Sequence, residues 1–301
     1  KSNLFFFNFF KNKLVLKKKI KLPVKFNSAK FDLIDKNRIV ICLDNKKIIL
    51  LENFKKKSFE KKLTSTRIIT SLVVFENKII LADQRNYCLQ IYNLKCEFLG
   101  KIGSKGTSVK NFDLPTEIKI YKNDLILSDQ NNDRFIKINK YFKTKLFKKR
   151  FKKKNDLNRP IKSLIIGKFL YVLDRENSRI QIFNLKLNFI RTFELKKINN
   201  SKPNSFCYSF KDNSFFILYR KSNYKNFLIK YNNKLKLTNE KKINTIDAQD
   251  ICCNNKHLFI ANTLGRSIDK YDLNLNFIKK CQIDILSNNS KVLIKTIYID
   301  Q

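Results

Sequence analysis

The chain has 301 residues, of which 43% are hydrophobic, and its formal net charge is +39. This apolar content is enough to bury a large core and argues against a disordered chain, and no apolar run reaches the roughly 18 to 20 residues of a membrane-spanning helix. The charge indicates an anionic partner such as nucleic acid, acidic lipid or an acidic protein, although abundant Lys, Asn and Phe are also typical of an A/T-rich coding sequence.

The seven cysteines have no regular spacing and are odd in number. A chain of this length does not need disulfide bonds to be stable, so free buried thiols in a reducing compartment are the simpler interpretation. We therefore expect an intracellular protein of the cytoplasm or an organelle matrix, with secretion as the alternative. Residues 4–10 form a short apolar run that Asn8 interrupts, and no small-residue cleavage site follows, so we do not expect a signal peptide.

A unit recurs along the chain, and each copy has an apolar strand that ends at a marker residue. Successive markers are separated by 39 to 46 residues. Regular spacing of this kind is typical of propellers and other repeat arrays, in which each small sheet buries its faces against its neighbours. The markers, which end the second strand of each unit, are Asp44, Asp83, Asp129, Asp174, Tyr219 and Asn262.

The stretch 169–193 defines the register inside the unit. In four copies an apolar residue stands six and nine positions after the marker, and Asn or Asp stands ten positions after it, as a tight turn into a fourth strand requires. A slip of one residue would reverse the faces of a strand, so a shared register is stronger evidence than shared composition. We expect the first strands at residues 70–75, 117–121, 160–166, 206–210 and 250–253.

These residues resemble the NHL-repeat β-propeller family. In that family an Asp ends the second strand, Asn and Arg occupy the turn, and Ile and an aromatic residue follow in the third strand. The copies at Asp129 and Asp83 match less fully than the best copy. The residues of the best copy are Asp174, Asn177, Arg179, Ile180 and Phe183. The resemblance implies an all-β propeller of four-stranded antiparallel blades and is poorly specific for activity.

Both ends of the chain contain segments that could form one more blade. Residues 4–22 resemble the third and fourth strands of a unit, and residues 291–301 resemble the end of a second strand. Pairing both termini in one blade would close a ring without leaving a free sheet edge. We therefore predict a single propeller over residues 1–301, with seven blades favoured over six.

The turns that follow the markers are expected to gather on one face of the propeller. Some NHL propellers, as the resemblance implies, bind single-stranded RNA on this face. Cations would neutralise phosphates there, and exposed aromatic rings could stack on bases. The candidate anion-binding residues are Arg85, Tyr87, Arg134, Lys148, Lys149, Arg150, Lys152, Lys153, Lys154, Arg175, Arg179, Tyr224 and Arg266. In a structural alternative, Arg134 and Arg179 bond the marker Asp residues, and the lysine run is a solvated edge.

Catalytic motifs are scarce in this sequence. His257 is the single histidine, which argues against a multi-histidine zinc centre. Cys252 and Cys253 are adjacent, so in a strand they point to opposite faces and cannot grip one ion together. The glycine-rich stretch 100–106 precedes no helical pattern and is expected to be a simple turn. The marker Asp residues would bind calcium only if they faced a central channel, and their repetition indicates a structural role.

The sequence therefore favours a propeller without enzymatic activity, cofactor or metal, serving in recognition or as a scaffold. Its expected partner is RNA, including ribosomal RNA, or an acidic protein surface, within a larger assembly. A propeller hydrolase or lyase with a channel-bound calcium ion is one alternative, and a neutral protein-interaction scaffold is another.

Overall fold

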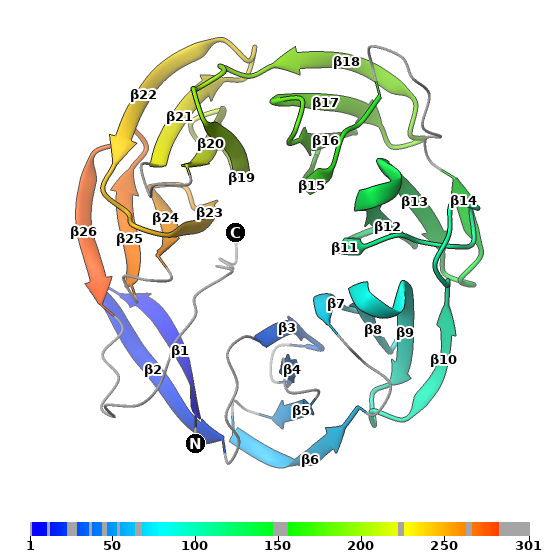
Figure 1. Ribbon diagram of the computed structural model, residues 1–301. Helices are drawn as coiled ribbons and strands as arrows, with labels where there is room; N and C mark the ends of the chain where they lie inside the picture. The colour runs from blue at the N-terminus through cyan, green and yellow to red at the C-terminus, as the bar shows by residue number, and fades with distance from the viewer. Residues whose placement is uncertain are drawn as a thin grey trace. The chain divides into compact units, whose positions relative to one another are not determined.

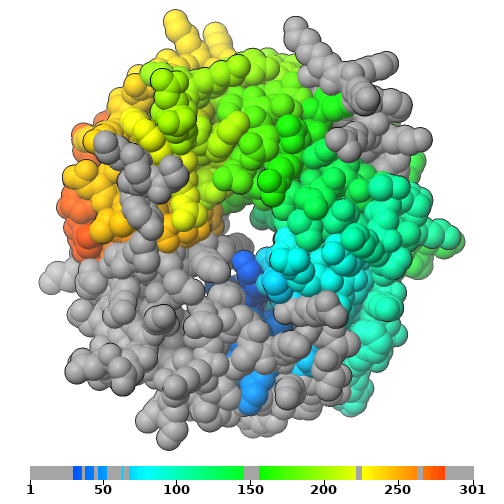
Figure 2. Space-filling model, viewed as in Figure 1, coloured from blue at the N-terminus to red at the C-terminus, as the bar shows by residue number. Residues whose placement is uncertain are grey.

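The computed structural model describes residues 2–10, 13–22, 29–35, 38–43, 47–52, 55–63, 68–146, 156–221, 226–262 and 267–282. The chain forms two compact units, Lys1–Pro160 and Ile161–Gln301, which we call the N-terminal and C-terminal units. Figure 2 gives a space-filling view in which the colours follow the sequence. The helices in the described ranges are two 3-10 turns of three residues each, so none of them is long enough to cross a membrane.

The N-terminal unit is built from antiparallel strands and the two 3-10 turns. They are β1 (Ser2–Phe10), β2 (Lys13–Leu22), β3 (Ala29–Leu33), β4 (Arg38–Leu43), β5 (Lys47–Glu52), β6 (Lys55–Lys62), β7 (Ile69–Phe75), β8 (Lys78–Asp83), η1 (Gln84–Asn86), β9 (Cys88–Asn93), β10 (Phe98–Ile102), β11 (Pro115–Tyr121), β12 (Asp124–Asp129), η2 (Gln130–Asn132), β13 (Arg134–Asn139) and β14 (Thr144–Leu146). Strands β3 to β14 form three four-stranded sheets in chain order, and β1 pairs with β2 in a two-stranded sheet (Figure 1). The first strands β3, β7 and β11 of successive sheets contact one another.

The C-terminal unit repeats the same plan. Its strands are β15 (Pro160–Ile166), β16 (Phe169–Asp174), β17 (Arg179–Asn184), β18 (Phe189–Glu194), β19 (Ser201–Ser209), β20 (Ser214–Lys221), β21 (Asn226–Asn232), β22 (Leu237–Ile243), β23 (Ala248–Cys253), β24 (His257–Asn262), β25 (Ser267–Asp272) and β26 (Phe277–Gln282). They form three four-stranded sheets in chain order, and the first strands β19 and β23 lie side by side (Figure 1).

Burial differs systematically between the four strands of a sheet. The second strands β8, β12 and β24 are buried along nearly their whole length. In β8, for example, Ile79 and Leu81 pack with the preceding sheet, and Ile80 and Ala82 pack with the following one. The fourth strand β22 is exposed at every position except its last. The cores therefore form between successive sheets, as where Phe75 and Leu89 of one sheet pack with Leu127 and Ile136 of the next.

Four of the six predicted markers end a second strand, whereas Tyr219 lies inside β20, which continues to Lys221. Strands β8, β12, β16 and β24 end at Asp83, Asp129, Asp174 and Asn262, and all four residues are fully buried. The remaining Asp marker, at position 44, lies outside the described residues. The buried carboxylates act within the scaffold, because each accepts hydrogen bonds from its own sheet or from the loop that precedes it.

Two of these bonds illustrate how the marker closes a sheet. An Asp83 carboxylate oxygen accepts from the backbone N–H of Ile68, at 3.3 Å, and an Asp129 oxygen accepts from that of Asp113, at 2.6 Å. Tyr219 makes the corresponding contact in the sheet β19–β22, where its hydroxyl donates to the carbonyl of Lys196 at 2.8 Å. In each case the marker side chain holds the segment that leads into the first strand of its sheet.

The tight turns into the fourth strands have the predicted Asn or Asp residue. Asn139 Oδ1 accepts from the backbone N–H groups of Tyr141 and Lys143, and Asp272 Oδ1 does the same for Asn274 and Asn276. Equivalent bonds fix the turns at Asn93, Asn184 and Asn232. Side chains of this type favour turns because they bond to their own backbone a few residues ahead.

The number of blades differs from the sequence-based expectation. The described residues form six four-stranded sheets rather than seven, and β1 and β2 pair only with each other. The spacing of the markers predicted the six sheets correctly. The seventh blade relied on residues 291–301, which lie outside the described residues, so closure by both termini stays a prediction.

Candidate functional site

Two of the candidate anion-binding arginines are buried within the scaffold. Arg134 is 4% exposed, and its Nε donates to Asp129 Oδ2 at 2.7 Å, while its other nitrogens donate to three carbonyls of the 104–112 loop. Arg179 is paired in the same way with Asp174. These contacts agree with the alternative that Arg134 and Arg179 bond the marker Asp residues. They also show that Arg134 holds the loop that follows the glycine-rich stretch.

The other candidates divide into a small described group and a larger group outside it. Arg85 is exposed, Tyr87 is half-buried beneath the Lys105 ammonium, and Arg175 is half-buried next to Glu176. The candidates that lie outside the described residues are Lys148, Lys149, Arg150, Lys152, Lys153, Lys154, Tyr224 and Arg266. Binding of RNA or of an acidic protein surface by this set stays a prediction.

A different set of polar side chains converges in the C-terminal unit. Lys162 of β15, Ser205 of β19 and Asp250 of β23 come from three successive first strands, near the ends that adjoin the markers. Lys162 Nζ donates to Asp250 Oδ1 at 2.5 Å and to Ser205 Oγ at 2.8 Å, and the Ser205 hydroxyl donates to Asp250 Oδ1. We call these three residues the inner-strand cluster.

The two carboxylate oxygens of Asp250 have different surroundings. Oδ1 accepts from Lys162, from Ser205 and from the backbone N–H of Ile251. Oδ2 accepts no hydrogen bond from the described residues and is not an enclosed atom. The Asp250 side chain is 12% exposed and that of Lys162 is 19% exposed, so the cluster is sheltered but reachable.

Ser205 has a structural counterpart in the N-terminal unit. Ser71 Oγ accepts from the backbone N–H of Ile118 in the next first strand, and Ser205 Oγ accepts likewise from Ile251. This repeated bond holds neighbouring first strands together. Ser205 therefore has a scaffold role that the repeat supplies, to which the C-terminal unit adds an ammonium and a carboxylate.

Cationic side chains lie near the cluster at the same ends of the strands. Lys202 and Arg220 are register partners in β19 and β20, and their side chains are 43% and 38% exposed. Lys202 Nζ donates to the carbonyl of Glu176 at 2.9 Å, and Arg220 pairs with Asp247 at 2.7 Å. Both cations are held in place and keep part of their surface in solvent.

The seven cysteines are free thiols and, except for the half-buried Cys252, are buried. Burial raises the pKa of Cys88 to about 11 and raises the pKa of Cys207 and Cys252 well above the ordinary value, so these thiols stay protonated at neutral pH. His257 begins β24, as the sequence indicated. The described residues contain no group of three or more His, Cys, Asp or Glu side chains that could hold a metal ion.

Comparisons with solved structures identify the class of fold. The chain resembles a catalytically inactive histidine-to-alanine variant of virginiamycin B lyase from Staphylococcus aureus with quinupristin, at a TM-score of 0.70 and 14% identity over 89% of this chain and 88% of that chain. It also resembles a protein proposed to be a 6-phosphogluconolactonase from Bacteroides fragilis, at a TM-score of 0.69 and 14% identity over 97% and 91% of the two chains. A protein of unknown function from Desulfotomaculum acetoxidans gives a TM-score of 0.65 at 13% identity, over 93% and 92%.

These likenesses confirm a β-propeller fold of four-stranded antiparallel blades. No family model matches the sequence, and no curated protein matches it, so membership of the NHL family stays a prediction. The expectation of a protein without enzymatic activity is corrected here, because the similar propellers include a lyase and a proposed lactonase.

Sequence reasoning missed the inner-strand cluster, although a signal was present. Lys162, Ser205 and Asp250 are 43 and 45 residues apart, which is the repeat interval, and each is a polar residue in a first strand. Aligning the first strands of the repeats would have found them. The less regular sequence of the first strands hid this alignment.

Proposed function

We propose that this protein is a hydrolase or lyase that acts beside a carbonyl group, with the inner-strand cluster as its reactive centre. The observation that carries the proposal is the asymmetry of Asp250, whose Oδ1 is held by three donors while Oδ2 is left to accept a proton. A general base needs this combination of fixed orientation and an available oxygen.

Asp250 and Lys162 would perform complementary steps. In a hydrolysis, Asp250 Oδ2 removes a proton from water while the water oxygen attacks the carbonyl carbon to form a tetrahedral adduct. The acyl–oxygen bond then breaks, and the protonated Asp250 returns its proton to the departing oxygen. In an elimination, the same carboxylate oxygen removes a proton from the α-carbon, the bond from the β-carbon to its leaving oxygen breaks, and that oxygen takes up the proton. Both reactions build negative charge on the carbonyl oxygen, which the Lys162 ammonium stabilises in a site sheltered from bulk water.

Ser205 is a positioning residue in this scheme. Its hydroxyl donates to Asp250 Oδ1 and its oxygen accepts from Lys162 Nζ, so it sets the separation of the base and the cation. It is 1% exposed and does not need to touch the substrate.

The cationic side chains of Lys202 and Arg220 favour binding of a negatively charged substrate. Both side chains are partly exposed, Lys202 on β19 and Arg220 on the adjacent β20, and each pairs with a carboxylate, Glu176 at 3.5 Å and Asp247 at 2.7 Å. The net charge of +39 would also attract an anionic substrate over a distance that falls with added salt. A lyase and a proposed phosphosugar lactonase among the similar propellers fit this chemistry.

A defined set of substrates tests the proposal. The purified protein is incubated with 6-phosphogluconolactone, with uncharged gluconolactone and with quinupristin, and the Asp250→Asn protein supplies the background rate. We expect turnover above that background, faster for the phosphorylated lactone than for the uncharged one. The product mass separates the two reactions, because hydrolysis adds one water and elimination does not. Wild-type rates equal to the background on all three compounds would count against the proposal.

A further inference from the structure

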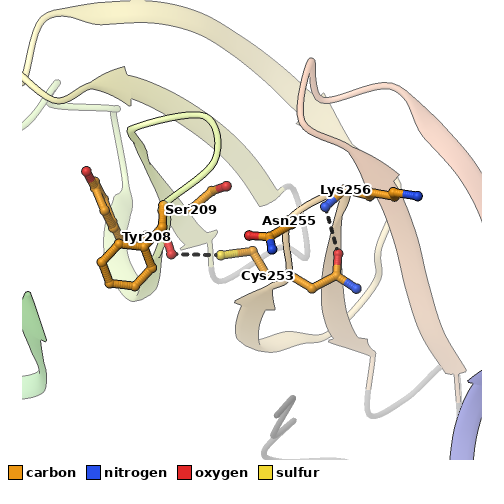
Figure 3. Close-up of a pocket in the computed structure, with 7 residues that line it drawn as sticks. Tyr208, Ser209, Cys253, Asn255 and Lys256 are labelled. Atoms are coloured by element: carbon orange, nitrogen blue, oxygen red, sulfur yellow. Dashed lines mark hydrogen bonds between the residues drawn. The ribbon is translucent and has the colours of Figure 1, made fainter. Parts of the chain in front are cut away.

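A pocket of about 260 Å³ lies in the C-terminal unit, away from the inner-strand cluster. It opens between the turn that joins β19 to β20 and the turn that joins β23 to β24. These turns are at the ends of the first strands opposite the markers, so the pocket is separate from the proposed reactive centre. Figure 3 shows Tyr208 and Ser209 on one side and Cys253, Asn255 and Lys256 on the other.

One wall of the pocket is aromatic and rigid. The rings of Tyr208 and Phe210 meet edge to face at 5.2 Å, and Tyr208 also packs against Phe215 at 4.7 Å. The Tyr208 hydroxyl donates to Asn213 at 3.1 Å, which fixes the ring. Phe210 is 56% exposed, so a ligand ring that packs against it would remove apolar surface from water.

The opposite wall is polar and positively charged. Asn254 shapes the turn, since its Oδ1 accepts from the backbone N–H groups of Lys256 and His257. The side chains of Asn255 and Lys256 are exposed, and neither makes a hydrogen bond or ion pair within the described residues. Cys253 Sγ donates to the Tyr208 carbonyl at 3.1 Å and ties the two walls together (Figure 3).

We propose that this pocket binds a small aromatic carboxylate, with the ring against Tyr208 and Phe210 and the carboxylate at Lys256 and the Asn255 amide. The volume is sufficient for an aromatic ring with its carboxylate. The charge selects an anion, because Lys256 is an available cation beside an apolar wall. Neither the fold nor the inner-strand cluster requires this site, so it is an additional function of the same unit.

The chain contains no tryptophan, and this allows a direct binding assay. Phe210→Trp introduces a single fluorophore at the edge of the pocket, at a position exposed enough to accept the larger ring. Titration with benzoate should change its fluorescence saturably, and cyclohexanecarboxylate and benzyl alcohol should bind at least several-fold more weakly. Equal binding of all three compounds, or no saturable change with benzoate, would overturn the proposal.

Two lysine variants, each combined with Phe210→Trp, test the polar wall. Lys256→Ala should weaken benzoate binding about tenfold, which is the usual loss for a charge-assisted hydrogen bond. Lys211→Ala is the matched control, because Lys211 is an exposed lysine on the neighbouring turn that does not line the pocket. It should leave the affinity within about twofold, because an exposed charge that does not contact the ligand is screened by salt. Equal losses in the two variants would mean non-specific attraction to a basic surface and would contradict the site.

Discussion

At the scale of single residues, buried ion pairs separate structural arginines from those at the surface. Arg134 and Asp129 are 4% and 0% exposed as side chains, and the arginine also donates to the loop that precedes β11. Arg85 has the same charge and stands two residues after a marker, yet it is exposed. The sequence named Arg134 as a possible structural partner of its marker Asp, but it also kept both arginines as candidate anion-binding residues, because burial depends on the conformation of the neighbouring loop.

Arg134→Ala should strongly destabilise the protein, whereas Arg85→Ala should not. Removing one partner of a buried pair leaves an uncompensated charge, which costs about 3–5 kcal/mol. An exposed substitution usually changes stability by less than about 0.5 kcal/mol. Urea unfolding of both variants measures the difference. Similar midpoints for the two variants would show that Arg134 does not act as the structure indicates.

His257 gives a second prediction at this scale. Burial, followed by the nearby Lys270 and Lys256 charges, lowers the pKa of His257 below its ordinary value of 6.5. The unfolded chain therefore takes up a proton at a higher pH than the folded chain does. The stability that neutral His257 provides is fully present above about pH 6.5 and is lost as the pH falls through its folded pKa.

Two measurements check this effect. As the single histidine, His257 gives one set of imidazole NMR signals, whose titration midpoint should lie below 6.5. The free energy of unfolding of His257→Gln should vary less between pH 7.5 and pH 5 than that of the wild type. A midpoint above 6.5 would contradict the burial of the imidazole.

At the scale of elements, the second strands β8, β12, β16 and β24 end at a buried marker residue, and in β20 the marker Tyr219 stands two residues before the end. The marker spacing predicted where these strands end, because the repeat has to place the same contact in every sheet. Tyr219 departs from the Asp pattern and still performs the contact through its hydroxyl. First-strand bounds were predicted less well, as with β19, which begins at Ser201 rather than at residue 206. This strand continues past a bulge between Pro203 and Ser205 that its sequence does not reveal.

Tyr219→Phe should lower the free energy of unfolding by about 1 kcal/mol or somewhat more. The change keeps the buried ring and removes the hydroxyl, with its hydrogen bond to the Lys196 carbonyl and its interaction with the Tyr231 hydroxyl. Tyr141→Phe is a suitable control, because Tyr141 is 71% exposed and its hydroxyl bonds to none of the described residues. Equal free energies of unfolding for the two variants would contradict the interpretation that Tyr219 replaces a marker Asp.

At the scale of the whole molecule, the dominant property is charge. With 64 basic and 25 acidic residues, the folded chain has strong repulsion among its own cations. The composition predicted an anionic partner, but it could not locate a site, since the cations are spread along the entire sequence. The inner-strand cluster combines side chains from three repeats, and only the folded arrangement of the first strands brings them together.

The melting temperature should rise as salt is added. Salt shortens the Debye length from about 30 Å at 0.01 M to about 10 Å at 0.1 M, and this weakens the repulsion between cations. Thermal unfolding in potassium chloride between these two concentrations measures the effect, with an equal osmolarity of glucose as the control. A melting temperature that is constant or falls would mean that the charges are already neutralised by pairing within the fold.

Catalysis by Asp250 is the central claim, and the initial rate on the substrate that the wild type turns over tests it most directly. Asp250→Asn keeps the shape of the side chain and removes the base, so the rate should fall by roughly 10² to 10⁴. Asp124→Asn removes a carboxylate from another Lys–Asp pair, with Lys137 at 2.7 Å, and should retain the rate within about twofold, because it lies outside the cluster. A rate for Asp250→Asn that equals the wild-type rate, in a folded protein, would contradict the account.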